Sequence, residues 1–200
     1  MRTLLLLLFL PLFGFGQGSQ NDLSSGQVIQ DSIPGTSIIL KDGNILFKKV
    51  YTSNLEKEAL SEKLGTLVSI MKGFKINNEI YQTNDQIVGR LFRHKFNVNK
   101  YDISSLSASS ILYSPFNAVV IVQIKDFKYQ VIISNIGIGE DGADSLKHRP
   151  TNDTMLETFM TEKKGSKLKA RKGYVKLAQT LNQEFADLFD LRKSNLAADF

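Results

Sequence analysis

The two histidines, His94 and His148, are the side chains of this 200-residue chain that are best suited to transfer protons near neutral pH. Neither lies in a motif that places a nucleophile and an orienting acid at a fixed spacing, so neither defines a catalytic set. The sequence contains no cysteine, which excludes a thiol nucleophile, a disulfide and a cysteine metal site. A metal site built on several imidazoles is not expected from only two histidines. We therefore predict no catalytic residue, no cofactor site and no metal site, and hence no enzymatic activity.

A basic stretch near the C-terminus is the densest cluster of charge in the chain, and no acidic residue interrupts it. Such a stretch can bind an anionic lipid, polysaccharide or nucleic acid. No aromatic residue is interleaved before Tyr174, so base stacking is not expected. A solvated linker leading into a helix has the same composition, and the sequence leaves both interpretations open. The candidate contacts with an anionic surface are Lys163, Lys164, Lys167, Lys169, Arg171 and Lys172.

A second candidate surface lies on a strand predicted over residues 86–98. Arg90, Phe92, His94 and Phe96 are spaced two residues apart. Because side chains alternate between the two faces of a strand, these four are expected to share one face. Cationic and aromatic side chains on a sheet face can contact a ligand, although an edge strand protected by charge has the same pattern.

The elements that must position these residues begin with several short strands. Alternating apolar and polar residues, together with turn signals such as Asp42-Gly43, indicate antiparallel pairing. The strongest pair flanks the turn at Asp126-Phe127 and predicts a hairpin. Gly89 suggests a bulge within its strand. The predicted strands cover residues 37–41, 44–51, 74–81, 86–98, 117–125 and 129–136.

Two long amphipathic helices are also predicted. Ser53-x-x-Glu56 has the form of a capping box, and apolar residues follow at helical spacing until Gly73, a suitable C-terminal cap. The last helix, over residues 173–193, has the most regular apolar stripe. A short helix is predicted over residues 152–162. We therefore predict an α+β fold, with a curved antiparallel sheet of about five to six strands and both long helices packed on one face.

The first residues indicate a cleavable signal peptide. Arg2 supplies a positive charge, Leu4–Leu10 is an unbroken apolar run, and Gly16 is a small residue before the expected cut. The apolar segment is shorter than the roughly 20 residues that a membrane-spanning helix needs. We predict a signal peptide over 1–16, a flexible leader over 17–35, one domain over 36–193 and a tail over 194–200. No transmembrane segment is expected after cleavage.

Three segments resemble a family of secreted bacterial proteins that is catalogued as a domain of unknown function with a TATA-box-binding-protein-like (TBP-like) fold. They are Gly43–Tyr51 (GNILFKKVY), Asp85–Leu91 (DQIVGRL) and Val119–Ile136 (VVIVQIKDFKYQVIISNI). The most distinctive piece is the turn Lys125–Tyr129. The resemblance covers residues 41–137 and implies a curved antiparallel sheet with helices on its convex side. It implies no activity and does not imply DNA binding, because fold does not fix function.

These observations together favour an exported, non-enzymatic binding domain of the cell envelope, either periplasmic or secreted. Its partner would be another envelope protein or an anionic polymer. A nucleic-acid partner is not expected, since an exported protein does not meet the chromosome. The alternative is a helix-grip carrier that encloses a hydrophobic ligand between its last helix and the sheet. A hydrolase is the third possibility, and it has the least support.

Overall fold

The structure of this protein is a computed structural model that describes residues 30–76, 85–101, 110–139, 154–162 and 165–194. The predicted signal peptide, His148, Lys163 and Lys164 lie outside the described residues. So does the predicted tail, apart from Ser194.

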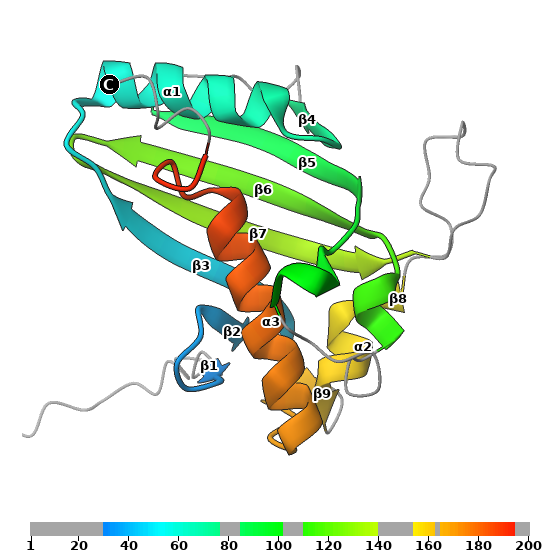
Figure 1. Ribbon diagram of the computed structural model, residues 1–200. Coiled ribbons are helices and arrows are strands. Elements are labelled where there is room, and N and C mark those ends of the chain that lie inside the picture. Colours follow the sequence, from blue (N-terminus) through cyan, green and yellow to red (C-terminus); the bar gives the residue numbers. More distant parts are fainter. Residues whose placement is uncertain (1–29, 77–84, 102–109, 140–153, 163–164, 195–200) are drawn as a thin grey trace, which may run out of the picture.

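One antiparallel sheet of eight strands forms the centre of the molecule, in the order β1-β2-β3-β7-β6-β5-β4 with β8 paired to the end of β7 (Figure 1). The predicted α+β class is confirmed, and the sheet has more strands than expected because β1 and β8 are short additions. Its strands are β1 (Gln30–Ser32), β2 (Ile38–Lys41), β3 (Asn44–Thr52), β4 (Phe74–Ile76), β5 (Gln86–His94), β6 (Phe116–Lys125), β7 (Lys128–Ile138) and β8 (Thr154–Met155). Because β1 lies within residues 17–35, the ordered fold begins before the predicted end of the leader.

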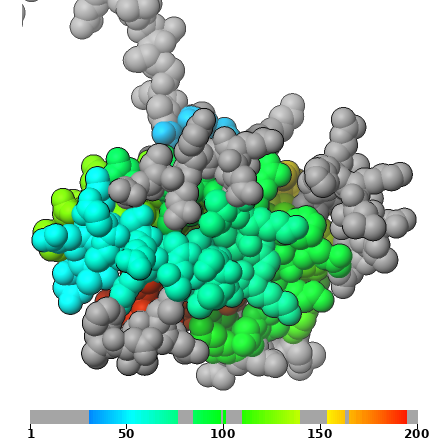
Figure 2. Space-filling model, turned by 90° about the horizontal axis from the view of Figure 1, so that it is seen from above, coloured from blue at the N-terminus to red at the C-terminus, as the bar shows by residue number. Residues whose placement is uncertain are grey.

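The remaining elements are helices, two short 3-10 turns and a small second ladder. The helices are α1 (Lys57–Ile70), α2 (Leu156–Met160) and α3 (Lys172–Leu188), and the 3-10 turns are η1 (Val98–Tyr101) and η2 (Ser110–Tyr113). Strands β9 (Thr161–Glu162) and β10 (Lys167–Leu168) pair with each other. In Figure 2 the long helix α1 runs along one side of the molecule, and the end of α3 is visible beside it.

Both long helices pack on the same face of the sheet. The core is one cluster that combines Leu60 and Leu64 of α1, Leu181 of α3 and the inward residues of the strands. Val88 is also buried but is not part of this cluster, because it points to the other face of β5. Alternation of side chains along each strand therefore separates a helix-covered inner face from an outer face.

A group of phenylalanines fills the space between α3 and the sheet. The ring of Phe185 on α3 lies 5.6 Å from Phe47 and 5.4 Å from Phe116 in edge-to-face geometry. Phe96 stacks on Phe116 with centroids 4.6 Å apart. Each fully buried large apolar side chain contributes roughly 1.5–3 kcal/mol, so this group anchors α3 to the sheet.

Helix α1 begins differently from the prediction. The proposed capping box is wrong, because Glu56 is the N-cap and its side chain makes no capping hydrogen bond. The Ser53 hydroxyl instead accepts a hydrogen bond from the backbone N–H of Leu55 at 3.1 Å. The N–H of Lys57 donates to the carboxylate of Asp126 on the β6–β7 turn at 3.0 Å. The first N–H groups of a helix have no partner within it, and here a side chain distant in sequence accepts the hydrogen bond of one of them.

Strand β5 contains a bulge at a position that the sequence did not indicate. The register with β6 shifts between Leu91 and His94, and Arg93 has a φ of 50°. The N–H of Arg93 donates to the side-chain oxygen of Asn117 at 2.8 Å. Gly89, where a bulge was predicted, instead leaves room for the ring of Phe74, which an added Cβ would approach to 2.4 Å. The bulge reverses the alternation, so residues beyond it point to the other face.

Candidate functional site

The outer side of the sheet is the candidate functional site, and we call it the open face. It consists of the outward residues of β2–β7. Cross-strand pairing defines its rows: Val88, Ile121, Ile132 and Lys48 form one row, and Arg90, Val119 and Ser134 form the next. A third row contains Gln86, Gln123, Gln130 and Val50.

The centre of the open face is apolar. Val119, Ile121 and Ile132 are each partly exposed, while Val88 is 8% exposed. One-sided antiparallel sheets ordinarily carry polar residues on the solvated face. Four β-branched apolar side chains on three adjacent strands depart from this pattern. We call this group the apolar strip.

The charges on the open face all have one sign. Among the outward positions of β2–β7 that the structure describes, several carry lysine or arginine and none carries aspartate or glutamate. The cations are Lys41, Lys48, Lys75, Arg90, Lys125 and Lys128. The face therefore has a positive potential that attracts anionic partners.

One end of the open face carries amides. The side chain of Gln130 donates a hydrogen bond to the side-chain oxygen of Gln123 at 3.0 Å across β6 and β7. Gln86 lies opposite Gln123 on the next strand. These amides offer further donors and acceptors to a bound partner.

Two of the four residues predicted to share a sheet face are on the open face. Arg90 is exposed beside Val119, and Phe92 is 37% exposed. The ammonium of Lys75 lies 5.1 Å from the centre of the Phe92 ring, a cation–π contact. The prediction that His94 and Phe96 share this face is wrong, because the bulge turns them inward: Phe96 is buried and His94 contacts Phe116.

The inward His94 belongs to a buried polar network. Its Nε2 lies 3.0 Å from Oε1 of Glu184 on α3, and the hydroxyl of Tyr101 donates to Oε2 of Glu184 at 2.6 Å. Burial, and then the hydrogen bond to Glu184, raise the pKa of Tyr101. The side chains of His94 and Glu184 are only 12% and 7% exposed. This network fixes α3 to β5 and η1, and it leaves His94 little access to a substrate.

A second carboxylate on α3 continues the network toward the surface. Asp187 pairs with Lys100 at 2.7 Å and also binds Lys193. Burial alone would raise the pKa of Asp187, but the hydrogen bonds from the two lysines outweigh it and lower the pKa. The pairs tie η1 and the chain after α3 to the helix.

The described part of the basic stretch contains one lysine that packs against the fold and three cations that are exposed. Lys169 donates to the carbonyl of Phe159 at 2.6 Å, and its ammonium lies 4.8 Å from the centre of the Tyr174 ring. Arg171 is the N-cap of α3 and Lys172 is its first residue, both exposed. Lys167 is exposed in β10. Contact of these residues with an anionic surface stays a prediction.

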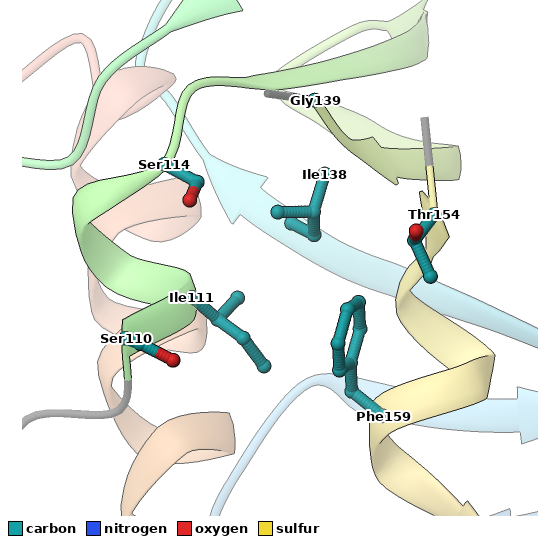
Figure 3. A pocket seen from close by; sticks show the side chains of 7 residues that line it. All are labelled: Ser110, Ile111, Ser114, Ile138, Gly139, Thr154 and Phe159. Atoms are coloured by element: carbon teal, nitrogen blue, oxygen red, sulfur yellow. The ribbon is translucent and has the colours of Figure 1, made fainter. Parts of the chain in front are cut away.

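A small pocket lies between η2, the end of β7 and the segment β8–α2 (Figure 3). Its volume is ≈ 160 Å³, and the side chains of Ile111, Ile138 and Phe159 converge on it. Ligand sites usually have about 300–1,000 Å³, so this pocket is small for a carrier. The space beneath α3, where a helix-grip carrier would hold its ligand, is filled by Phe47, Phe116 and Phe185. Neither this pocket nor the space beneath α3 supports the alternative of a helix-grip carrier.

The described residues contain neither a candidate metal site nor a candidate membrane-spanning helix. No group of three or more histidine or acidic side chains there has a geometry that could hold a metal ion. In the same part of the chain, no helix combines the length and apolar character required to cross a bilayer.

The fold and the open face define the class: an α+β protein whose curved antiparallel sheet is covered by helices on one face. The sequence matches no protein-family model and no curated protein. One similar crystal structure is a TBP-like protein from Parabacteroides distasonis ATCC 8503, with 15% identity, a TM-score of 0.48, and coverage of 77% of this chain and 96% of that one. Another is a DUF4468 family protein from Bacteroides ovatus ATCC 8483, with 14% identity, a TM-score of 0.42, and coverage of 78% and 86%. These descriptions agree with the resemblance found in the sequence.

Proposed function

We propose that this protein is an exported, non-enzymatic binding domain of the cell envelope that holds its partner on the open face. The observation that carries the proposal is the apolar strip, which Val88, Val119, Ile121 and Ile132 form within a purely cationic set of charges on the side of the sheet opposite to α1 and α3. The inner face needs no partner, since α1 and α3 already bury it. Export is supported by the N-terminal sequence from Arg2 to Gly16, which has the composition of a signal peptide.

Site-specific crosslinking in the cells that make the protein tests this proposal directly. The chain contains no cysteine, so a single introduced thiol can carry a photoactivatable group without background labelling. Val119→Cys places the group at the centre of the open face, and Glu62→Cys places it on the exposed side of α1 as a matched control. We expect a crosslinked product of discrete mass from Val119→Cys alone.

Two results would contradict the proposal. If both cysteine variants gave the same products, the open face would have no preference as a contact surface. If the isolated protein began at Met1 and remained in the cytoplasm, the envelope location would be wrong. N-terminal sequencing of the same preparation supplies this second measurement, with Gln17 as the expected first residue.

A further inference from the structure

The dimensions of the apolar strip indicate what it binds. The strip extends over β5, β6 and β7, and neighbouring strands lie about 4.8 Å apart, so it is about 10 Å wide. An α-helix with its side chains has a diameter of about 10–12 Å. One helix lying along the strands therefore covers the strip.

Cations border the strip on both sides. Lys48 on β3 is adjacent to Ile132, while Arg90 on β5 and Lys75 on β4 continue the row of Val119 on the other side. Lys48 and Arg90 are three strand spacings apart, about 14 Å. A helix between them would meet positive charge along both edges of its apolar stripe. Acidic residues at those edges would form ion pairs at the rim of the contact.

The same charges disfavour other occupants. A second copy of this chain would bring Lys48 and Arg90 against cations of the same face, and like charges in contact oppose binding. Val50 on β3 is also apolar and 55% exposed, but a second sheet that covered β3 and β4 would bury Lys48 and Lys75 as well, and burying charges without partners opposes binding. A partner that is apolar along its centre and acidic at its edges fits these charges.

We infer that the open face binds an amphipathic helix of another protein, with acidic residues on both sides of its apolar stripe. This inference rests on the proposed function, because it names the partner of the same surface. Recognition follows the helix-in-groove mode, in which the apolar stripe supplies affinity and the flanking charges supply orientation.

Labelled model peptides of about 18 residues, which form a helix of about 27 Å, test the inference by fluorescence anisotropy. One peptide has a leucine stripe flanked by glutamate, and its partner has lysine at the same positions. We expect the glutamate peptide to bind the full protein and the lysine peptide not to bind. The double variant K48E/R90E should weaken binding of the glutamate peptide at least about tenfold. The variant K72E/K176E makes the same change of charge after α1 and on α3, away from both candidate surfaces, and should leave binding unchanged.

Failure of the inference can be distinguished from failure of the proposed function. Equal binding of both peptides, or no effect of K48E/R90E on binding, would overturn the inference that the partner is an acidic helix. The proposed function would still stand if the crosslink at Val119 remained specific, because the open face would still be the binding surface. Phosphatidylglycerol vesicles and a DNA duplex are tested in the same way. If one of them bound instead of the glutamate peptide, and K48E/R90E lost that binding, the partner would be a lipid surface or a nucleic acid and not an acidic helix. If Val119→Cys gave no specific crosslink, both the proposed function and the inference about its partner would be wrong. Circular dichroism of each variant confirms that it is folded.

Discussion

Two stacked tyrosines hold the C-terminal end of α3 against the sheet. The rings of Tyr51 and Tyr129 lie 4.8 Å apart and within 5° of parallel. Their hydroxyls donate to the carbonyls of Ala186 at 3.0 Å and Phe189 at 2.7 Å, respectively. The Tyr129 hydroxyl also accepts a hydrogen bond from the N–H of Leu191 at 3.2 Å. The last carbonyls of a helix have no partner within it, so these hydroxyls complete the end of α3.

Substituting phenylalanine for either tyrosine removes the hydroxyl but keeps the ring, so it measures the hydrogen bonds apart from the ring stacking. Tyr51→Phe removes one donor, whereas Tyr129→Phe removes a donor and an acceptor. Loss of a typical hydrogen bond costs about 0.5–1.5 kcal/mol, and a buried group left without a partner costs about 1–3 kcal/mol. We expect the free energy of unfolding to fall by about 1 kcal/mol in Tyr51→Phe and by about 2 kcal/mol in Tyr129→Phe.

Urea denaturation followed by circular dichroism measures both losses, and an unchanged m-value shows that they are changes in stability. Alkaline pH provides a second reading. Burial raises the pKa of Tyr129 from 10.0 to about 12. A raised pKa stabilises the fold below the ordinary value, and this stability is lost as pH rises toward the folded value. Tyr129→Phe should therefore lose less stability over that range than the natural protein. A Tyr129→Phe protein no less stable than Tyr51→Phe would refute this reasoning.

Two further substitutions test other contacts. Hydrogen bonds from Arg192 hold the pKa of Asp190 below its ordinary value of 3.8. Asp190→Asn should therefore cost about 1 kcal/mol at neutral pH and make no difference once the pH lies below the lowered pKa of the folded protein, where the natural carboxyl is protonated. A constant difference in urea titrations at both pH values would contradict this. Gly89→Ala should cost about 1–3 kcal/mol, because the new Cβ meets the Phe74 ring. Adding Phe74→Leu to Gly89→Ala should recover part of that stability. If the losses of stability from the two single substitutions simply added in the double variant, the two positions would not interact.

The hairpin β6–β7 and the helix α3 could be predicted from the sequence because their signals are local. Residues 117–125 and 129–136 alternate on either side of a tight turn, and the structure pairs them as the predicted hairpin, with a register shift between Asn117 and Val119 that was not predicted. The stripe of α3 repeats at helical spacing, and its members Leu177, Leu181 and Phe185 are all buried. Neither signal depends on contacts distant in sequence.

The bulge in β5 and the start of α1 could not be predicted, because each depends on a distant side chain. Asn117 satisfies the N–H of Arg93, and Asp126 satisfies the N–H of Lys57. A local pattern contains no information on either bond. The error at the bulge reached the candidate site, since it placed His94 and Phe96 on the wrong face.

The open face was only partly visible in the sequence. Four successive apolar residues, Val119–Val122, make their strand apolar on both sides, and Arg90 and Phe92 belong to the predicted sheet-face contacts. The sequence could not show which side the helices cover, because that depends on how α1 and α3 pack. Once the register is known, the outward residues on β5–β7 follow from alternation alone.

The position of α3 in the chain has a consequence for how the protein is made. Hydrogen bonds join Ser37 to Asn182 and Tyr51 to Ala186, across 145 and 135 residues. During synthesis, every strand of the main sheet leaves the ribosome before the helix that covers its centre. The inner face of the sheet can therefore be fully covered only after α3 has emerged. Until then its apolar side chains are exposed, and such intermediates are prone to aggregate.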